Sequence, residues 1–449
     1  MPKIKTINSV EDLMCPFNVI AISKLIRKMF WHTVLCAFMI SGNNAWGLTG
    51  KAQKIFKSNN IAVYQIQVVD LISQEKSVIG SGFKFNKKGL YGTNFHVISD
   101  VVDKPDQFRI EYHRDGMKKG ELDLVAIDVA HDLAILKGPE NKEETVVLGS
   151  SKLAQGSQVF PMGNPLDVGM VILEGTFNGL IGNKQYQHIL TSASLNPGMS
   201  GGPAFGPRGK VIGINVAIEG NDLSYLVPVE YLKNLEKSLD AEGAKPGWRQ
   251  IIQDQVLKRS DHLVSSAIKS EWKFEQFGSL KVPKNIMPLV IKCWGKSKKE
   301  DPKKNQFYFY SYKWCESKNN VYLSSRLGTG TIGYTFYSME SESLNSLEFY
   351  KKYSKEYSTG QFYRRYSKEE VTEFRCQDHF IQMAGNNWKA AYCVRGYKKY
   401  SLLNDVYVSL AILNDSKRKF IIQIGISGVN EPQTRRFLKK FLGGIEWTG

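Results

Sequence analysis

The sequence contains no Cys-x-x-Cys pair and no apolar run of the length that a membrane-spanning helix needs. Zinc modules usually draw their ligands from such tight cysteine pairs, so we expect neither a metal nor another cofactor. The apolar segment Phe30–Ile40 is shorter than the roughly 20 residues that cross a bilayer. With 449 residues, 42% of them hydrophobic and 12% aromatic, the chain is expected to form two or three packed domains.

Acidic residues are few relative to basic ones: 43 Asp and Glu stand against 60 Lys and Arg, a formal net charge of +17. A basic surface attracts nucleic acid, anionic lipid and acidic polymers alike. The lysines are scattered and no nucleic-acid-binding module is recognisable, so we expect no nucleic-acid partner. The clusters Lys296–Lys304, Lys417–Lys419 and Arg435–Lys440 suggest peripheral contact with an anionic envelope surface, although a solvated lysine-rich face explains them as well.

The first 47 residues have the order of an export signal. The basic segment Lys24–Lys28 precedes the apolar segment Phe30–Ile40, and a small-x-small cleavage site follows at Ala45 and Gly47. We therefore predict a signal peptide over residues 1–47 and a periplasmic or secreted protein. An uncleaved membrane anchor is the alternative.

The four cysteines beyond that segment all lie after residue 290. Cys376 and Cys393 are placed symmetrically about the turn 385–387, and Cys293 and Cys315 flank the polar loop 295–305. Each pair can face across its own hairpin within disulfide reach. We predict the disulfides Cys293–Cys315 and Cys376–Cys393, which suit an exported protein.

Three regions of the chain differ in their patterns. Residues 61–229 form short strands separated by Gly, Asn and Asp turns, typical of an all-β barrel or sandwich. Helical spacing follows at 230–240 and 248–275, and strands return from about Lys281 before a last helix that begins near Asn430. We predict a mainly β protein with a β domain at 55–235, a helical connector at 236–280 and an α+β domain at 281–449.

A glycine-rich segment around Ser200 carries the strongest chemical signal. The hexapeptide Gly198–Pro203 (GMSGGP) places glycines two residues before and one residue after the serine. Glycine tolerates positive φ and has no side chain to obstruct a substrate carbonyl. Ser200 is therefore the candidate nucleophile, and the amides of Gly198 and Ser200 are the candidate oxyanion hole. Taken alone, the segment is also compatible with an idle serine in a Gly-Pro turn.

Two further segments supply a base and the acid that orients it. The strand-like segment Leu90–Ile98 (LYGTNFHVI) presents His96, and Asp132 stands at the head of an apolar strand. A carboxylate in that place can bind the histidine Nδ1–H, which fixes the tautomer and stabilises the imidazolium. Asp128 and His131 are nearby decoys, because Asp128 lies four residues before the apolar strand and His131 lacks the flanks of His96.

The order His, Asp, Ser and these local motifs resemble the trypsin-like fold, and most of all the bacterial HtrA/Deg-type serine proteases. The resemblance covers residues 55–235 and implies a double β-barrel that performs acyl transfer with His96, Asp132 and Ser200. It rests on the segments Gly80–Phe83, Thr93–Ile98, Asp132–Leu136, Gly163–Pro165, Leu195–Pro203, Val211–Asn215 and Tyr225–Pro228.

The chain departs from this family in two respects. HtrA-type enzymes usually continue into a peptide-binding PDZ domain, which the aromatic C-terminal third does not resemble, so activation by peptide binding is not carried over. Met199 stands where asparagine or aspartate is usual. Because the oxyanion hole needs only the backbone of that residue, we expect activity to survive.

By the same resemblance, the floor of the primary specificity pocket lies near Ser194, and Asn215, Val216 and Ala217 form a wall. No acid occupies the Ser194 position, so we expect a small or medium apolar side chain instead of Arg or Lys. Asp222, if it entered the pocket from the next loop, would reverse that preference.

We therefore predict a secreted serine endopeptidase that hydrolyses peptide bonds in protein or peptide substrates through an acyl-enzyme. The alternative is a catalytically latent protease-fold protein that holds extended peptides as a chaperone or adaptor. The oligomeric state stays open.

Overall fold

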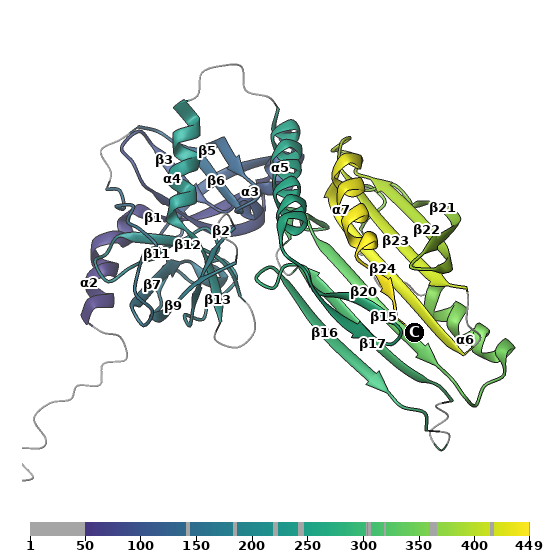
Figure 1. The fold of residues 1–449 in the computed structure, drawn as a ribbon. Coiled ribbons are helices and arrows are strands. Elements are labelled where there is room, and N and C mark those ends of the chain that lie inside the picture. Colours follow the sequence, from purple (N-terminus) through teal and green to yellow (C-terminus); the bar gives the residue numbers. More distant parts are fainter. Residues whose placement is uncertain are drawn as a thin grey trace, which may run out of the picture. The chain divides into compact units, whose positions relative to one another are not determined.

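The computed structural model describes residues 50–448, apart from 141–143, 183–185, 219–222, 241–246, 302, 304–306, 318–319, 359–365 and 414–416. The predicted signal peptide lies outside this range. The described chain is mainly β, as expected, with two barrels, a long helix and an α+β region in that order (Figure 1). None of its described helices is long and apolar enough to cross a bilayer.

The first barrel is closed by six strands in the order β1-β2-β3-β6-β5-β4. Alternate residues of β1, such as Tyr64, Ile66 and Val68, are fully buried, because every second side chain of a strand points into the barrel. Helix α3 adds Ile98 and Val102 to this core. The elements are α2 (Gly50–Asn59), η1 (Asn60–Ala62), β1 (Val63–Asp70), β2 (Lys76–Lys84), β3 (Leu90–Thr93), α3 (Phe95–Asp103), β4 (Phe108–Arg114), β5 (Met117–Asp128) and β6 (Leu133–Lys137).

The second barrel has the strand order β11-β12-β13-β10-β9-β7, and pairing of β11 with β7 closes it; β8 extends the sheet beyond β7. The two barrels are the double-barrel arrangement that the sequence predicted. The elements are β7 (Gln158–Gly163), η2 (Pro165–Asp167), β8 (Val171–Ile172), β9 (Gly175–Ile181), β10 (His188–Thr191), β11 (Pro203–Phe205), β12 (Val211–Ile218) and β13 (Ser224–Pro228).

Two helices follow the barrels, α4 (Val229–Lys237) and α5 (Trp248–Lys269), with η3 (Ser238–Asp240) after α4. The sequence prediction of a helix as far as Glu275 is wrong. Ser270 is extended, and the indole of Trp272 folds back to donate to the Ala267 carbonyl at 2.8 Å. This bond satisfies one of the carbonyls that a helix end leaves unpaired, and Lys273 already belongs to the next strand.

The C-terminal region is built on an antiparallel sheet of seven strands in the order β16-β17-β20-β24-β23-β22-β21. Its strands are β16 (Ile291–Lys298), β17 (Phe309–Ser317), β20 (Ile332–Glu340), β21 (Arg375–Met383), β22 (Asn386–Gly396), β23 (Asn404–Ile412) and β24 (Arg418–Val429). A smaller sheet contains β14 (Lys273–Phe277), β15 (Leu280–Asn285) and β25 (Glu446–Trp447), and a separate hairpin contains β18 (Val321–Ser324) and β19 (Leu327–Thr329).

Helices cover both faces of the seven-stranded sheet. Phe437 of α7 (Glu431–Gly443) packs in one core with Ile422, whereas Phe349 of α6 (Ser346–Ser358) packs with the adjacent Ile421 (Figure 1). Because neighbouring residues of a strand point to opposite faces, α6 and α7 lie on opposite sides. The region is thus α+β, as predicted.

Both predicted disulfides are present. Cys293 pairs with Cys315 across β16 and β17, and Cys376 pairs with Cys393 across β21 and β22, each with a Cα–Cα distance of 4.0 Å. Strand β16 continues to Lys298, so the loop predicted from residue 295 begins later than expected. Each bond joins residues that face each other in the strand register.

Candidate active site

His96 and Asp132 form a two-point contact at the start of α3. The Asp132 carboxylate accepts from His96 Nδ1 at 2.6 Å through one oxygen and from the His96 backbone amide at 2.9 Å through the other. Asp132 itself has φ +56°, a conformation that aspartate tolerates better than most residues. Its carbonyl is held by the Phe95 amide and the Asn94 side chain, so the acid is fixed from both ends.

The protonation of His96 follows from this contact. Burial lowers the pKa of His96, but the charge of Asp132 and its hydrogen bond together outweigh burial and raise the pKa above the ordinary value. An ionised carboxylate can only accept, so the imidazole proton resides on Nδ1. The neutral ring then offers Nε2 as a base.

Ser200 lies in a loop that glycine geometry permits. Gly198 has φ +93° and Gly201 has φ +84°. A Cβ atom on Gly201 would stand 2.2 Å from both the Ser81 carbonyl oxygen and Thr93 Oγ1, so only glycine fits there. The Ser200 hydroxyl points to the Val216 carbonyl at 3.2 Å.

Hydrogen bonds connect this loop to strand β3, which precedes the histidine. The Ser81 amide donates to the Ser200 carbonyl at 2.7 Å, and Thr93, three residues before His96, donates its hydroxyl to the Ser81 carbonyl at 2.8 Å. The Ser81 hydroxyl in turn donates to the Gly198 carbonyl at 2.7 Å. Ser81, which the sequence marked only as part of a motif, therefore joins the two halves of the site.

A hydrogen bond from Leu166 fixes the orientation of the peptide group that precedes Gly198. The Pro197 carbonyl accepts from the Leu166 amide at 3.0 Å. In a trans peptide the C=O and N–H groups point in opposite directions, so the Gly198 N–H faces away from Leu166. Within the described residues, neither the Gly198 amide nor the Ser200 amide donates to a backbone carbonyl.

The two decoys pair with each other. His131 Nδ1 lies 2.7 Å from an Asp128 carboxylate oxygen, and the His131 ring stacks on Tyr231 and Tyr186 at centroid distances of 3.8 and 5.2 Å. Asp128 and His131 thus form a pair separate from that of His96 and Asp132.

The Asn215 side chain of the expected pocket wall lies in the protein interior. Asn215 is fully buried, and its side-chain amide donates to the carbonyls of Met162 and Met199 at 3.0 and 3.2 Å. The Asn215 side chain therefore holds the backbone of Met199, the residue directly before Ser200. Val216 borders the serine through its carbonyl and Ser194 is exposed. The side chain of Ala217 and all of Asp222 lie outside the described residues.

The Met199 side chain anchors the serine loop to the second barrel. Its side chain is fully buried in the second barrel, in one cluster with Val159, Leu195 and Leu226. Apolar packing thus anchors the loop at the position where the family usually has asparagine or aspartate.

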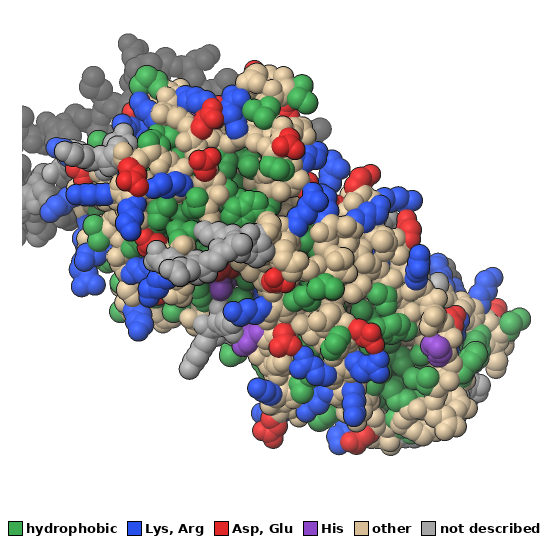
Figure 2. Space-filling model, turned by 90° about the horizontal axis from the view of Figure 1, so that it is seen from above, with side chains coloured by type: hydrophobic (Ala, Val, Ile, Leu, Met, Phe, Trp, Pro, Cys, Tyr) green, Lys and Arg blue, Asp and Glu red, His purple; other side chains and the backbone are tan. Residues whose placement is uncertain are grey.

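Several cations of the basic clusters are buried or paired with acids, so fewer of them can contact an anionic surface than the sequence suggests. Lys419 is fully buried, and its ammonium donates to Tyr350 Oη and the Leu413 carbonyl at 3.0 and 3.1 Å. Arg435 pairs with Glu431 and Arg436 with Asp261. Lysines and arginines are interspersed with acids over the face that Figure 2 shows. The cluster at 296–304 lies partly outside the described residues.

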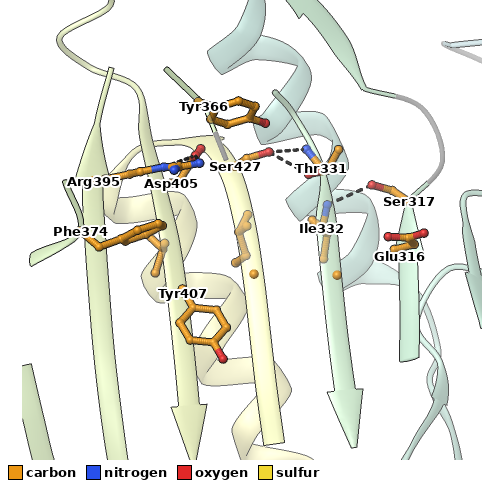
Figure 3. A pocket seen from close by; sticks show the side chains of 14 residues that line it. Glu316, Ser317, Thr331, Ile332, Tyr366, Phe374, Arg395, Asp405, Tyr407 and Ser427 are labelled. Atoms are coloured by element: carbon orange, nitrogen blue, oxygen red, sulfur yellow. Dashed lines mark hydrogen bonds and ion pairs between the residues drawn. The ribbon is translucent and has the colours of Figure 1, made fainter. Parts of the chain in front are cut away.

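A cavity of about 140 Å³ lies in the C-terminal sheet (Figure 3). Arg395 bonds Asp405 through Nε and Nη2 at 2.9 and 2.7 Å, and its guanidinium lies between the rings of Tyr366 and Phe374, 4.6 Å from each centroid. This volume is below the several hundred Å³ of a usual ligand pocket, so we interpret the pair as structural. In the described part of the chain, no group of three His, Cys, Asp or Glu residues is placed to hold a metal ion.

Removal of one partner of this buried pair is expected to destabilise the protein strongly. The Arg395→Ala variant leaves the Asp405 carboxylate buried without its cation, which typically costs about 3–5 kcal/mol. Arg435→Ala removes one partner of an exposed pair and should cost about 0.5 kcal/mol or less. Urea unfolding with disulfides intact measures both free energies, and equal losses would contradict the structural role.

Residues 80–214 match the family model of the trypsin-like peptidase domain, and this part of the chain is a domain of that class. A "Putative serine protease HhoA" of Synechocystis is 32% identical over 180 residues, which make up 37% of this chain and 44% of that protein. A "Probable periplasmic serine endoprotease DegP-like" of Pseudomonas fulva is 31% identical over 196 residues, 41% of this chain and 40% of that protein. The relatives of the domain are thus HtrA/Deg-type serine proteases, and the chain spans less than half the length of these two.

A solved structure titled "Crystal structure of Deg5" is 27% identical and covers 42% of this chain and 95% of that chain. Its TM-score is 0.36.

Proposed function

We propose that the protein is a serine endopeptidase in which Ser200, His96 and Asp132 form the catalytic triad. The two-point contact of Asp132 with His96 is the observation that carries the proposal, because it sets both the ring position and the tautomer that a general base requires. The names of the relatives support the same class of activity.

In the proposed mechanism, Ser200 Oγ attacks the peptide carbonyl while His96 Nε2 takes its proton. The amides of Gly198 and Ser200 stabilise the oxyanion, and the imidazolium returns the proton to the leaving nitrogen. Water then attacks the acyl-enzyme with the same base. The substrates are protein or peptide chains with a small or medium apolar side chain at the acylated position. The two disulfides and the periplasmic names of relatives support an exported enzyme.

A fluorophosphonate probe tests this proposal, because it reacts only with an activated serine. The protein lacking residues 1–47 should be labelled, and Ser200→Ala should not. Ser150→Ala is a matched control, since Ser150 is exposed and bonds Glu230; it should be labelled like the parent. A folded parent protein that resists labelling would instead favour the peptide-binding chaperone or adaptor.

A further inference from the structure

The hairpin β18–β19 of the C-terminal region packs on the helix that carries His96. Val321, Leu323 and Leu327 are buried in the same apolar cluster as Ile98 and Val102 of α3. The hairpin therefore shares a core with the first barrel.

Other contacts fix the C-terminal region at this place. Lys399 pairs with Asp103, the last residue of α3, at 2.6 Å. Arg259 of α5 donates to the Gly330 carbonyl at 2.8 Å, directly after β19. The hairpin is thus held by charged and apolar contacts together.

Tyr322 points from this hairpin to His96. Its ring lies edge-on to the imidazole, with centroids 5.8 Å apart and an interplanar angle of 67°. The Ser99 side chain also lies beside the Tyr322 hydroxyl, and the Ser99 hydroxyl donates to the His96 carbonyl at 3.2 Å. The Tyr322 side chain therefore lies against the first turns of α3.

A peptide substrate bound for attack by Ser200 would pass close to the Tyr322 ring. An extended peptide whose carbonyl is attacked by Ser200 would run beside β12, because the register of β12 with β11 ends at Ile214 and leaves that edge open beside Val216. Its side chains alternate between two sides. If the acylated residue points toward Ser194, the preceding residue points to the other side, toward His96 and Tyr322.

We propose that Tyr322 is a specificity-determining residue that limits the size of the substrate side chain preceding the acylated residue. The C-terminal region thereby completes the substrate groove of the protease domain. This inference rests on the proposed function, because it needs Ser200 to be acylated.

Two peptidyl phosphonates test the inference, each with valine at the reactive position and either alanine or phenylalanine before it. The second-order labelling rates are measured for the parent, Tyr322→Ala, Tyr322→Phe and Arg326→Ala. Their ratio is independent of the folded fraction, because both probes report on the same active molecules. Arg326 is a matched control, exposed at the turn of the same hairpin.

The parent should prefer alanine over phenylalanine. Tyr322→Ala should reduce that preference by about tenfold or more, which is the usual size of the change in specificity when a pocket wall is altered. Tyr322→Phe and Arg326→Ala should keep it. An unchanged ratio in Tyr322→Ala, or an equal change in Tyr322→Phe, would overturn the role of the ring. Labelling of the parent by the small fluorophosphonate but by neither peptide probe would overturn it as well. A parent that resists even the small probe would refute the proposed function instead.

Discussion

Replacement of His96 by alanine is expected to lower kcat on the order of 10⁶-fold, the loss that removal of the base causes in an intact triad. His96 is the base in the proposed mechanism because Asp132 occupies its Nδ1 and leaves Nε2 for the serine proton. His96 belongs to helix α3, whose buried apolar residues pack without a contribution from the imidazole ring. The loss should therefore appear in kcat and not in folding.

His131→Ala is the matched control for this experiment. His131 also has a carboxylate partner, Asp128 at 2.7 Å, but its ring stacks on two tyrosines. Its removal should lower the thermal midpoint and leave kcat within a few fold. The kcat of both variants is measured by steady-state cleavage of an apolar peptide. The active-site concentration used for kcat is taken from fluorophosphonate labelling of the parent. Comparable losses of kcat in the two variants would contradict the assignment of the base.

The sequence could single out the residues of the proposed triad because their signals are local. The glycines around Ser200 require a tight loop, and the strand before His96 and the strand after Asp132 each mark one end of a barrel element. The disulfides could be predicted for the same reason, because each joins cysteines on adjacent strands of one hairpin. In each case the chemistry and the chain segment that positions it lie within a few tens of residues.

Other features depend on contacts that no local pattern encodes. Ser81 reaches Gly198, and Asn215 reaches Met162, only after the strands have assembled. Lys419 looks like a surface cation in the sequence, yet two tyrosine rings and a carbonyl surround it. Tyr322 belongs to a different region of the chain from His96, and nothing in the spacing indicates that they meet. Such long-range contacts explain why local patterns could single out the residues of the proposed triad but not the residues that surround them.

Asp132→Asn is expected to lower kcat by about 10⁴-fold while the protein remains folded. Asparagine tolerates the positive φ of Asp132 nearly as well as aspartate does, so the backbone should not be strained as it would be by alanine. The asparagine oxygen can still accept from the His96 amide. Its NH₂ group then faces Nδ1 and forces the imidazole proton onto Nε2, where it blocks the removal of the serine proton.

The pH dependence gives this variant a second signature. In the parent, the charge and hydrogen bond of Asp132 raise the pKa of His96, so activity should fall as the pH drops through that raised value. Without the carboxylate the pKa of His96 falls, and the acid limb of the residual activity should move to lower pH. Asp128→Asn, which alters the His131 pair, should shift neither kcat nor the acid limb. If Asp132→Asn kept the parent kcat and pH profile, another group would have to orient His96. An amide cannot hold the imidazole in the basic tautomer through the contacts that this carboxylate makes.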